Sequence, residues 1–162
     1  MLVLRPDAAS WVDTALEPHV WCPAEWHLVI MNALRLEYGE QGARDFGAAR
    51  LRDSLRAGAT APILRCWMRS YGNAPGDLLR VTPYIWNAVT RAVGRVTVTS
   101  SREREVEVQV TGLPETARRC TGWHRYLEGY GAAWLAAGSY EGARVEVGSG
   151  PAPGRVDARV TW

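Results

Sequence analysis

The stretch RVTVTSSREREVEVQV, residues 95–110, decides the fold because its hydrophobic residues recur at every second position. A period of two is typical of a β-strand, and two such runs joined by a short polar segment predict a hairpin. The valines that share one face of this hairpin are Val96, Val98, Val106, Val108 and Val110. Polar residues occupy the alternate positions, so we expect an antiparallel pair with one covered and one solvated face.

The chain that precedes this hairpin has the period of a helix. Trp26, Ile30 and Leu34 recur four positions apart, which places them on one helical face, and the glycines of YGEQG then interrupt the pattern. Residues 1–22 are expected to form an N-terminal extension with a short helix. Residues 23–93 are expected to form several helices.

After the first hairpin, residues 117–138 read as one long helix, and residues 143–162 return to the alternation of strands. The intervening GSGPAPG is a loop signal that separates two strands of a second hairpin. Residues 94–162 therefore predict two hairpins split by a helix. We expect a single α+β domain over residues 1–162, in which an N-terminal helical bundle precedes a β-β-α-β-β antiparallel sheet, an α/β-plait.

The predicted helix 117–138 has two faces that differ in side-chain size. Large side chains form a stripe that we expect to cover the sheet: Cys120, Trp123, Leu127, Tyr130 and Trp134. The other face is small, and its candidate interface residues are Gly122, Gly129, Ala133 and Ala136. An interior glycine costs about 1 kcal/mol relative to alanine, so this face needs a packing reason. Close packing on the N-terminal helices, the seam of a homodimer and the floor of a cavity all remain open.

Composition excludes several classes of function. The formal net charge is +2 and the basic residues form no run, so we expect no nucleic-acid partner. No apolar stretch approaches the roughly 18 residues of a membrane span, and the apolar N-terminus before Arg5 is too short for a signal peptide. Three widely spaced cysteines form no disulfide framework. We therefore expect a cytoplasmic protein.

Eight tryptophans is a high number for 162 residues. Aromatic residues at helical spacing are usually part of the core, because they bury a large area. The alternative is that some of them line an apolar pocket of the kind that small molecules occupy. The candidates for that pocket are Trp67, Tyr84, Trp86, Trp123 and Tyr126.

No catalytic motif is present: the chain has no GxSxG, no phosphate-binding loop, no lysine and no HExxH. Cys120 and His124 are four residues apart and share a helical face, so they are weak candidates for a metal site or for a Cys–His nucleophile. We predict neither an enzyme nor a bound cofactor.

Three phrases carry a resemblance to a known superfamily. They are LEYGEQGARDFGAARLRDSL at 36–55, TPYIWNAVTRAVGRVTV at 82–98, and GWHRYLEGYGAAWL at 122–135. The chain resembles the superfamily that contains the 4-vinyl reductase-type small-molecule-binding domain and the vesicle-tethering subunits of the TRAPP complex, and is most similar to an uncharacterised myxobacterial family within it. The resemblance implies an α/β-plait and a non-enzymatic role.

The resemblance also implies a zinc site in some relatives, held by cysteines and a glutamate. Cys120 would stand near one such position and Glu141 or Glu146 near another, but the final hairpin has no cysteine, so we predict no zinc. Two functions follow as expectations. The first is a regulatory or scaffolding module that forms a homodimer or docks a partner protein through the 117–138 helix; the alternative is a sensor that binds a hydrophobic small molecule between the helices and the sheet.

Overall fold

The computed structural model describes residues 24–57, 61–71, 74–90 and 93–162. The short helix predicted within residues 1–22 lies outside this part of the chain. The helices that precede the sheet in the described residues are α2 (Ala24–Ala57), α3 (Ala61–Tyr71), α4 (Pro75–Arg80) and α5 (Thr82–Val89). They are followed by β1 (Arg95–Arg102), β2 (Glu105–Thr111), α6 (Glu115–Arg119), α7 (Thr121–Ala137), β3 (Arg144–Ser149) and β4 (Val156–Thr161).

The strands form one antiparallel sheet in the order β1-β2-β4-β3, with each hairpin contributing two neighbouring strands. Val96 lies opposite Val110, and Val98 lies opposite Val108, so the predicted valine face is continuous across the first hairpin. Val156 continues this face on β4. The α+β architecture and the two hairpins split by helical structure are therefore confirmed.

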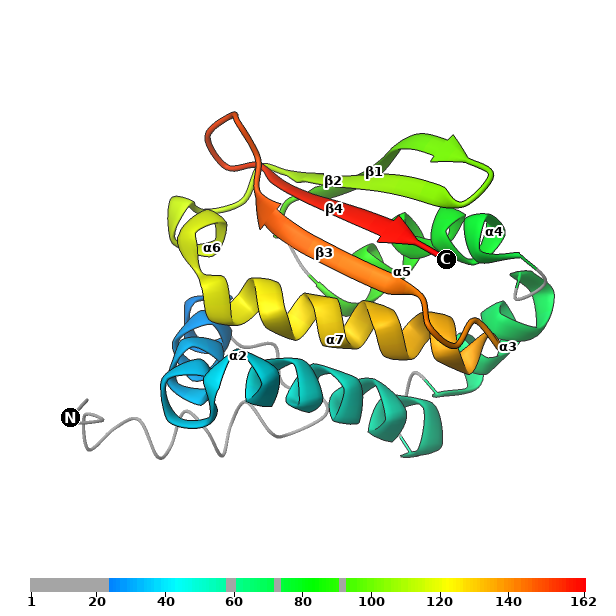
Figure 1. Cartoon of the computed structure of the whole chain (residues 1–162), viewed down its shortest axis with the longest axis horizontal. Helices are drawn as coiled ribbons and strands as arrows, with labels where there is room; N and C mark the ends of the chain where they lie inside the picture. Colours follow the sequence, from blue (N-terminus) through cyan, green and yellow to red (C-terminus); the bar gives the residue numbers. More distant parts are fainter. Residues whose placement is uncertain (1–23, 58–60, 72–73, 91–92) are drawn as a thin grey trace.

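Helices cover only the valine face of the sheet (Figure 1). α7 runs beneath β3, α5 lies beside β1, and α2 packs on the far side of α7. One hydrophobic core lies between the sheet and the helices, and it includes Met31, Leu51, Leu78 and Leu135. The opposite face of the sheet carries charged residues.

The prediction of one continuous helix over residues 117–138 is wrong in detail. α6 ends at Arg119, Cys120 has extended backbone (φ −82°, ψ 91°), and α7 begins at Thr121. The Cys120 carbonyl accepts a hydrogen bond from the His124 backbone N–H, which starts the new helix. The break leaves the α7 stripe intact, since Trp123 and Trp134 are buried against the core as predicted.

The buried face of α2 also differs from the predicted one. Leu28 and Met31 are the buried residues of its first half, whereas Ile30 and Leu34 are only partly buried. The interruption predicted at YGEQG occurs at Gly39, whose φ of 73° kinks the helix. Positive φ is accessible to glycine at little cost, so this residue permits the bend.

Three glycines bring α2 and α7 into direct backbone contact. A Cβ atom on Gly122 would lie 2.3 Å from the Met31 carbonyl oxygen, and one on Gly129 would lie 1.9 Å from the Arg44 carbonyl oxygen. The third contact has the glycine on α2: a Cβ on Gly47 would lie 2.1 Å from the Tyr126 carbonyl oxygen of α7. No real side chain fits at these distances, so the helix pair requires bare backbone at all three positions.

Candidate functional site

A cavity of about 480 Å³ lies between the valine face of the sheet and the helices α2, α5 and α7. The strands line it with Val96, Val108, Val110, Val145, Val147, Val156, Ala158 and Val160. Apolar residues of α7, among them Leu127 and Leu135, form the facing wall. Its volume falls within the roughly 300–1,000 Å³ typical of small-molecule sites.

Two tryptophans form the aromatic wall of the cavity. The rings of Trp86 on α5 and Trp123 on α7 meet edge to face, with centroids 6.3 Å apart and an interplanar angle of 67°. The Trp86 Nε1 donates a hydrogen bond of 2.7 Å to the Val93 carbonyl oxygen. This bond fixes the Trp86 ring, since its one polar group is satisfied within the protein.

Polar side chains gather where α2 meets α7. The rings of His27 and Tyr126 meet edge to face at 5.0 Å, and the ring of Tyr130 lies 6.0 Å from that of Tyr126. Arg50 and Ser54 of α2 complete this part of the lining. The cavity is therefore apolar over most of its surface and polar along α2, a combination that can orient a bound molecule.

Burial keeps these polar groups uncharged. Burial, aided by the nearby positive charge of Arg50, lowers the pKa of His27 to about 4. Burial also raises the pKa of Tyr126 and of Tyr130, an effect that the charge of Arg50 opposes in both. At neutral pH the imidazole and both phenols are neutral hydrogen-bonding groups, and Arg50 is the charged residue among those described in the lining.

The structure brings together three of the five predicted pocket residues. Trp86, Trp123 and Tyr126 line the cavity. Trp67 packs against the core from α3 but lies outside the lining. Tyr84 is 68% exposed on α5, so its placement in a pocket was wrong.

Several lining residues were missed from the sequence. His27, Arg50 and Tyr130 belong to the polar part, and Trp134 belongs to the wall. Tyr130 and Trp134 lie on the predicted sheet-facing stripe of α7, which could have indicated them. His27 and Arg50 are 23 positions apart on a kinked helix, and no spacing rule connects them.

The candidate interface residues divide between two environments. Gly122 and Gly129 contact α2 of the same chain, so close packing on the N-terminal helices explains both of them. Ala136 is exposed and Ala133 is partly buried, and both border a second, open groove of about 1310 Å³ along α7 and β3. A second copy of the chain could reach these two glycines only if α2 moved away from α7. The prediction that Gly122 and Gly129 form a dimer interface is therefore wrong in this fold.

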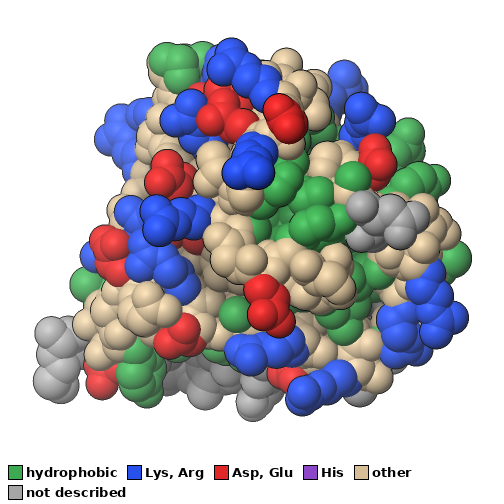
Figure 2. Space-filling model, turned by 45° about the vertical axis from the view of Figure 1, so that its right-hand side comes forward, with side chains coloured by type: hydrophobic (Ala, Val, Ile, Leu, Met, Phe, Trp, Pro, Cys, Tyr) green, Lys and Arg blue, Asp and Glu red, His purple; other side chains and the backbone are tan. Residues whose placement is uncertain are grey.

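The second groove carries charges of both signs, and some of them pair within the protein. Arg155 lies 2.7 Å from Asp157, and Arg159 lies 3.0 Å from Glu105 on the neighbouring strand. Figure 2 shows Lys or Arg side chains mixed with Asp or Glu on the surface, around a recess where hydrophobic side chains are visible. Because charges of both signs line it, the groove favours neither an anion nor a cation.

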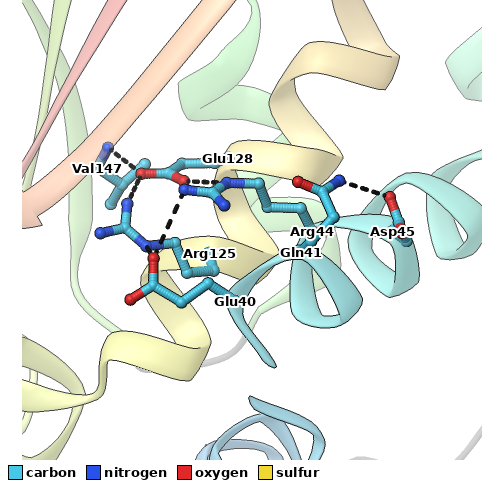
Figure 3. Close-up of polar contacts among 7 residues, drawn as sticks. All are labelled: Glu40, Gln41, Arg44, Asp45, Arg125, Glu128 and Val147. Atoms are coloured by element: carbon cyan, nitrogen blue, oxygen red, sulfur yellow. Dashed lines mark hydrogen bonds and ion pairs between the residues drawn. The ribbon is translucent and has the colours of Figure 1, made fainter. Parts of the chain in front are cut away.

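Glu128 is the centre of a buried ion-pair network that joins α2, α7 and β3 (Figure 3). It is 5% exposed, and its Oε2 lies 2.8 Å from the Arg44 Nε. Its Oε1 pairs with Arg125 and accepts a 3.0 Å hydrogen bond from the Val147 backbone N–H. Arg125 also lies 3.0 Å from Glu40. β3 is an edge strand, so the Val147 N–H has no partner strand on its outer side. Glu128 accepts the hydrogen bond in place of a strand.

The Cys120–His124 pair does not form a metal site with the residues described. The Cys120 Sγ lies 3.6 Å from the Leu28 carbonyl oxygen, to which it donates. Burial lowers the pKa of His124, whose Nε2 has no partner within the described ranges. No group of three or more His, Cys, Asp or Glu residues in the described part of the chain could hold a metal ion. These residues therefore do not fit the zinc that the family resemblance implies.

Comparisons with protein-family models, with curated proteins and with solved structures found no significant match to this chain. The resemblance to the 4-vinyl reductase and TRAPP superfamily stays a prediction. Among the described helices, none has the length and apolar character needed to cross a membrane.

Proposed function

We propose that this protein binds an apolar small molecule in the cavity between α2, α5, α7 and the sheet, and that it acts without catalysing a reaction. The observation that carries the proposal is the combined size and lining of this cavity: about 480 Å³, walled by valines and tryptophans. Protein interiors are otherwise packed as densely as organic crystals. A partly open, mostly apolar recess of this size is of the kind that small molecules occupy.

The organisation of the lining supports the same proposal. The Trp86–Trp123 pair holds one wall in a fixed orientation, and the neutral polar groups lie together where α2 meets α7. A ligand that fills such a site buries apolar area, which contributes about 25 cal/mol per Å² removed from water. The few polar groups set its orientation and contribute specificity.

The role expected first from the sequence, docking of a partner through α7 and the adjacent sheet edge, has weaker support. Gly122 and Gly129 are covered by α2, and the central N–H of β3 is bound by Glu128. Of the four candidate interface residues, Ala136 is exposed and Ala133 is partly buried. We therefore favour ligand binding.

Native mass spectrometry of the purified protein, before and after incubation with 1-decanol, tests this proposal. We expect a one-to-one adduct, either with 1-decanol or with a molecule retained from the expression host. Ala158→Phe should abolish it, because the new ring would occupy the cavity from β4. Leu127→Trp fills the cavity from α7 and serves as a second filling variant.

Ala136→Phe is the matched control, since Ala136 is exposed on α7 and lies outside the cavity lining. It should bind as the natural protein does. An absent adduct in the natural protein, or an equal adduct in both filling variants, would overturn the proposal.

A further inference from the structure

We infer that the ligand of this cavity is an apolar molecule with a single carboxylate, and that the carboxylate binds Arg50 at the α2 side of the cavity. The inference rests on the proposed function and specifies the chemical class of its ligand. It is carried by the position of one cation in an otherwise apolar lining.

Arg50 has no carboxylate partner among the described residues, and it is the arginine of the described cavity lining. Arg44 and Arg125 pair with Glu128, and Arg155 pairs with Asp157. Arg50 forms no such pair in the described part of the chain, and the described lining of the cavity includes no Asp or Glu. Within the described residues its guanidinium is thus unpaired, and it can bind an anion.

The surroundings of Arg50 favour an anionic head over a neutral one. The phenols of Tyr126 and Tyr130 line the same part of the cavity and can each donate a hydrogen bond to a carboxylate oxygen. The Ser54 hydroxyl lines it too, but it already donates a 2.8 Å hydrogen bond to the Arg50 carbonyl oxygen. Neutral His27 adds a further polar group without adding charge. A guanidinium and a carboxylate also match in shape, because the planar fork of donors can bond both oxygens.

The number of charges sets the ionic class of the ligand. One cation in the described lining balances one negative charge, whereas a phosphate monoester would bring close to two. Arg50 is exposed while Trp123, Trp134 and most of the lining valines are buried, which places the head at the mouth and the apolar body inside. A medium-chain fatty acid is a simple probe with this chemistry.

Titrations with decanoate and with 1-decanol, followed by tryptophan fluorescence at pH 7.5, test the inference. The two probes share a tail and differ in the charge of the head, and Trp86, Trp123 and Trp134 report from the lining. We expect decanoate to bind about tenfold more tightly than 1-decanol, the size typical of a charge-assisted hydrogen bond. Arg50→Gln should weaken decanoate binding by about tenfold and leave 1-decanol binding within about twofold.

Arg52→Gln is the matched control, since Arg52 is exposed on the same helix and lies outside the cavity lining. It should leave both affinities unchanged. Equal binding of the two probes together with no effect of Arg50→Gln would overturn the inference and leave the proposed function standing. An equal loss in Arg52→Gln would likewise overturn it. Failure of both probes to bind the natural protein would overturn the proposed function as well.

Discussion

The backbone of Gly129 on α7 lies so close to Arg44 on α2 that a Cβ atom there would sit 1.9 Å from the Arg44 carbonyl oxygen. Two further contacts of the same kind, at Gly122 and Gly47, hold the helices together along their length. This pairing fixes α2, which carries His27 and Arg50, against α7, which carries Tyr126 and Tyr130. The glycines that cost helix stability therefore have a structural reason within the chain.

Gly129→Ala should destabilise the fold by about 1–3 kcal/mol, although alanine favours a helix by about 1 kcal/mol, because the methyl group would collide with backbone that cannot rotate away. Gly131→Ala on the same helix is the control, since its Cβ would meet Val145 methyl groups at 3.3 and 3.4 Å. Urea denaturation of the two variants measures the difference. Equal stabilities would contradict the close contact of α2 with α7.

Glu128→Ala should cost about 2–3 kcal/mol of unfolding free energy, because it leaves Arg44, Arg125 and the Val147 N–H without their buried acceptor. The loss should be below that of a fully buried pair, since the side chains of Arg44 and Arg125 are 33% and 26% exposed. Glu128→Gln keeps an acceptor for the Val147 N–H, so it should lose less unfolding free energy than Glu128→Ala. Thermal denaturation measures both variants.

Glu115→Ala is the matched control for that series. Glu115 forms ion pairs with Arg118 and Arg119 on the surface of α6, where solvent screens them. Its removal should leave the melting temperature nearly unchanged. If Glu115→Ala lowered the melting temperature as much as Glu128→Ala does, the network around Glu128 would stabilise the fold no more than a surface ion pair.

Stability should fall as the pH falls from about 6.5 toward 4. The folded-state pKa of His27 is about 4 against 6.5 for the free side chain, so in this window the unfolded chain binds a proton that the folded chain does not. The contribution of neutral His27 to the free energy of unfolding is fully present above pH 6.5. Its loss at low pH amounts to as much as about 3 kcal/mol.

His27→Gln removes this titration, so its stability should vary less between pH 6.5 and 5 than that of the natural protein. Denaturation midpoints across the pH series provide the measurement. An unchanged slope would show that His27 is not buried as described.

The sequence was most informative where a single period decides the structure. Alternating valines such as Val96 and Val110 predict the strands and their shared face, and the stripe of Trp123 and Trp134 predicts the side of α7 that meets the core. Gly39 marks the kink in α2 because positive φ has a strong residue preference. Each of these features depends on residues close together in the chain, so it can be predicted from one sequence.

The cavity could be predicted only in part, because its residues meet through tertiary packing. Trp86 and Trp123 were candidates as aromatic residues, but the same argument also proposed Tyr84, which is exposed. Arg50 looks like any solvated residue on a helix, and only the fold places it beside His27 and Tyr126. Glu128 likewise gave no signal, since its partners lie on two other elements.

The most direct measurement is a titration with the neutral fluorescent probe N-phenyl-1-naphthylamine, read by energy transfer from the tryptophans that line the cavity. We expect saturable binding at one site in the natural protein and in Ala136→Phe, and binding at least about tenfold weaker in Ala158→Phe, whose ring would fill the same space. Absence of saturable binding to the natural protein, or equal binding to a folded Ala158→Phe variant, would contradict a ligand site between these helices and the sheet.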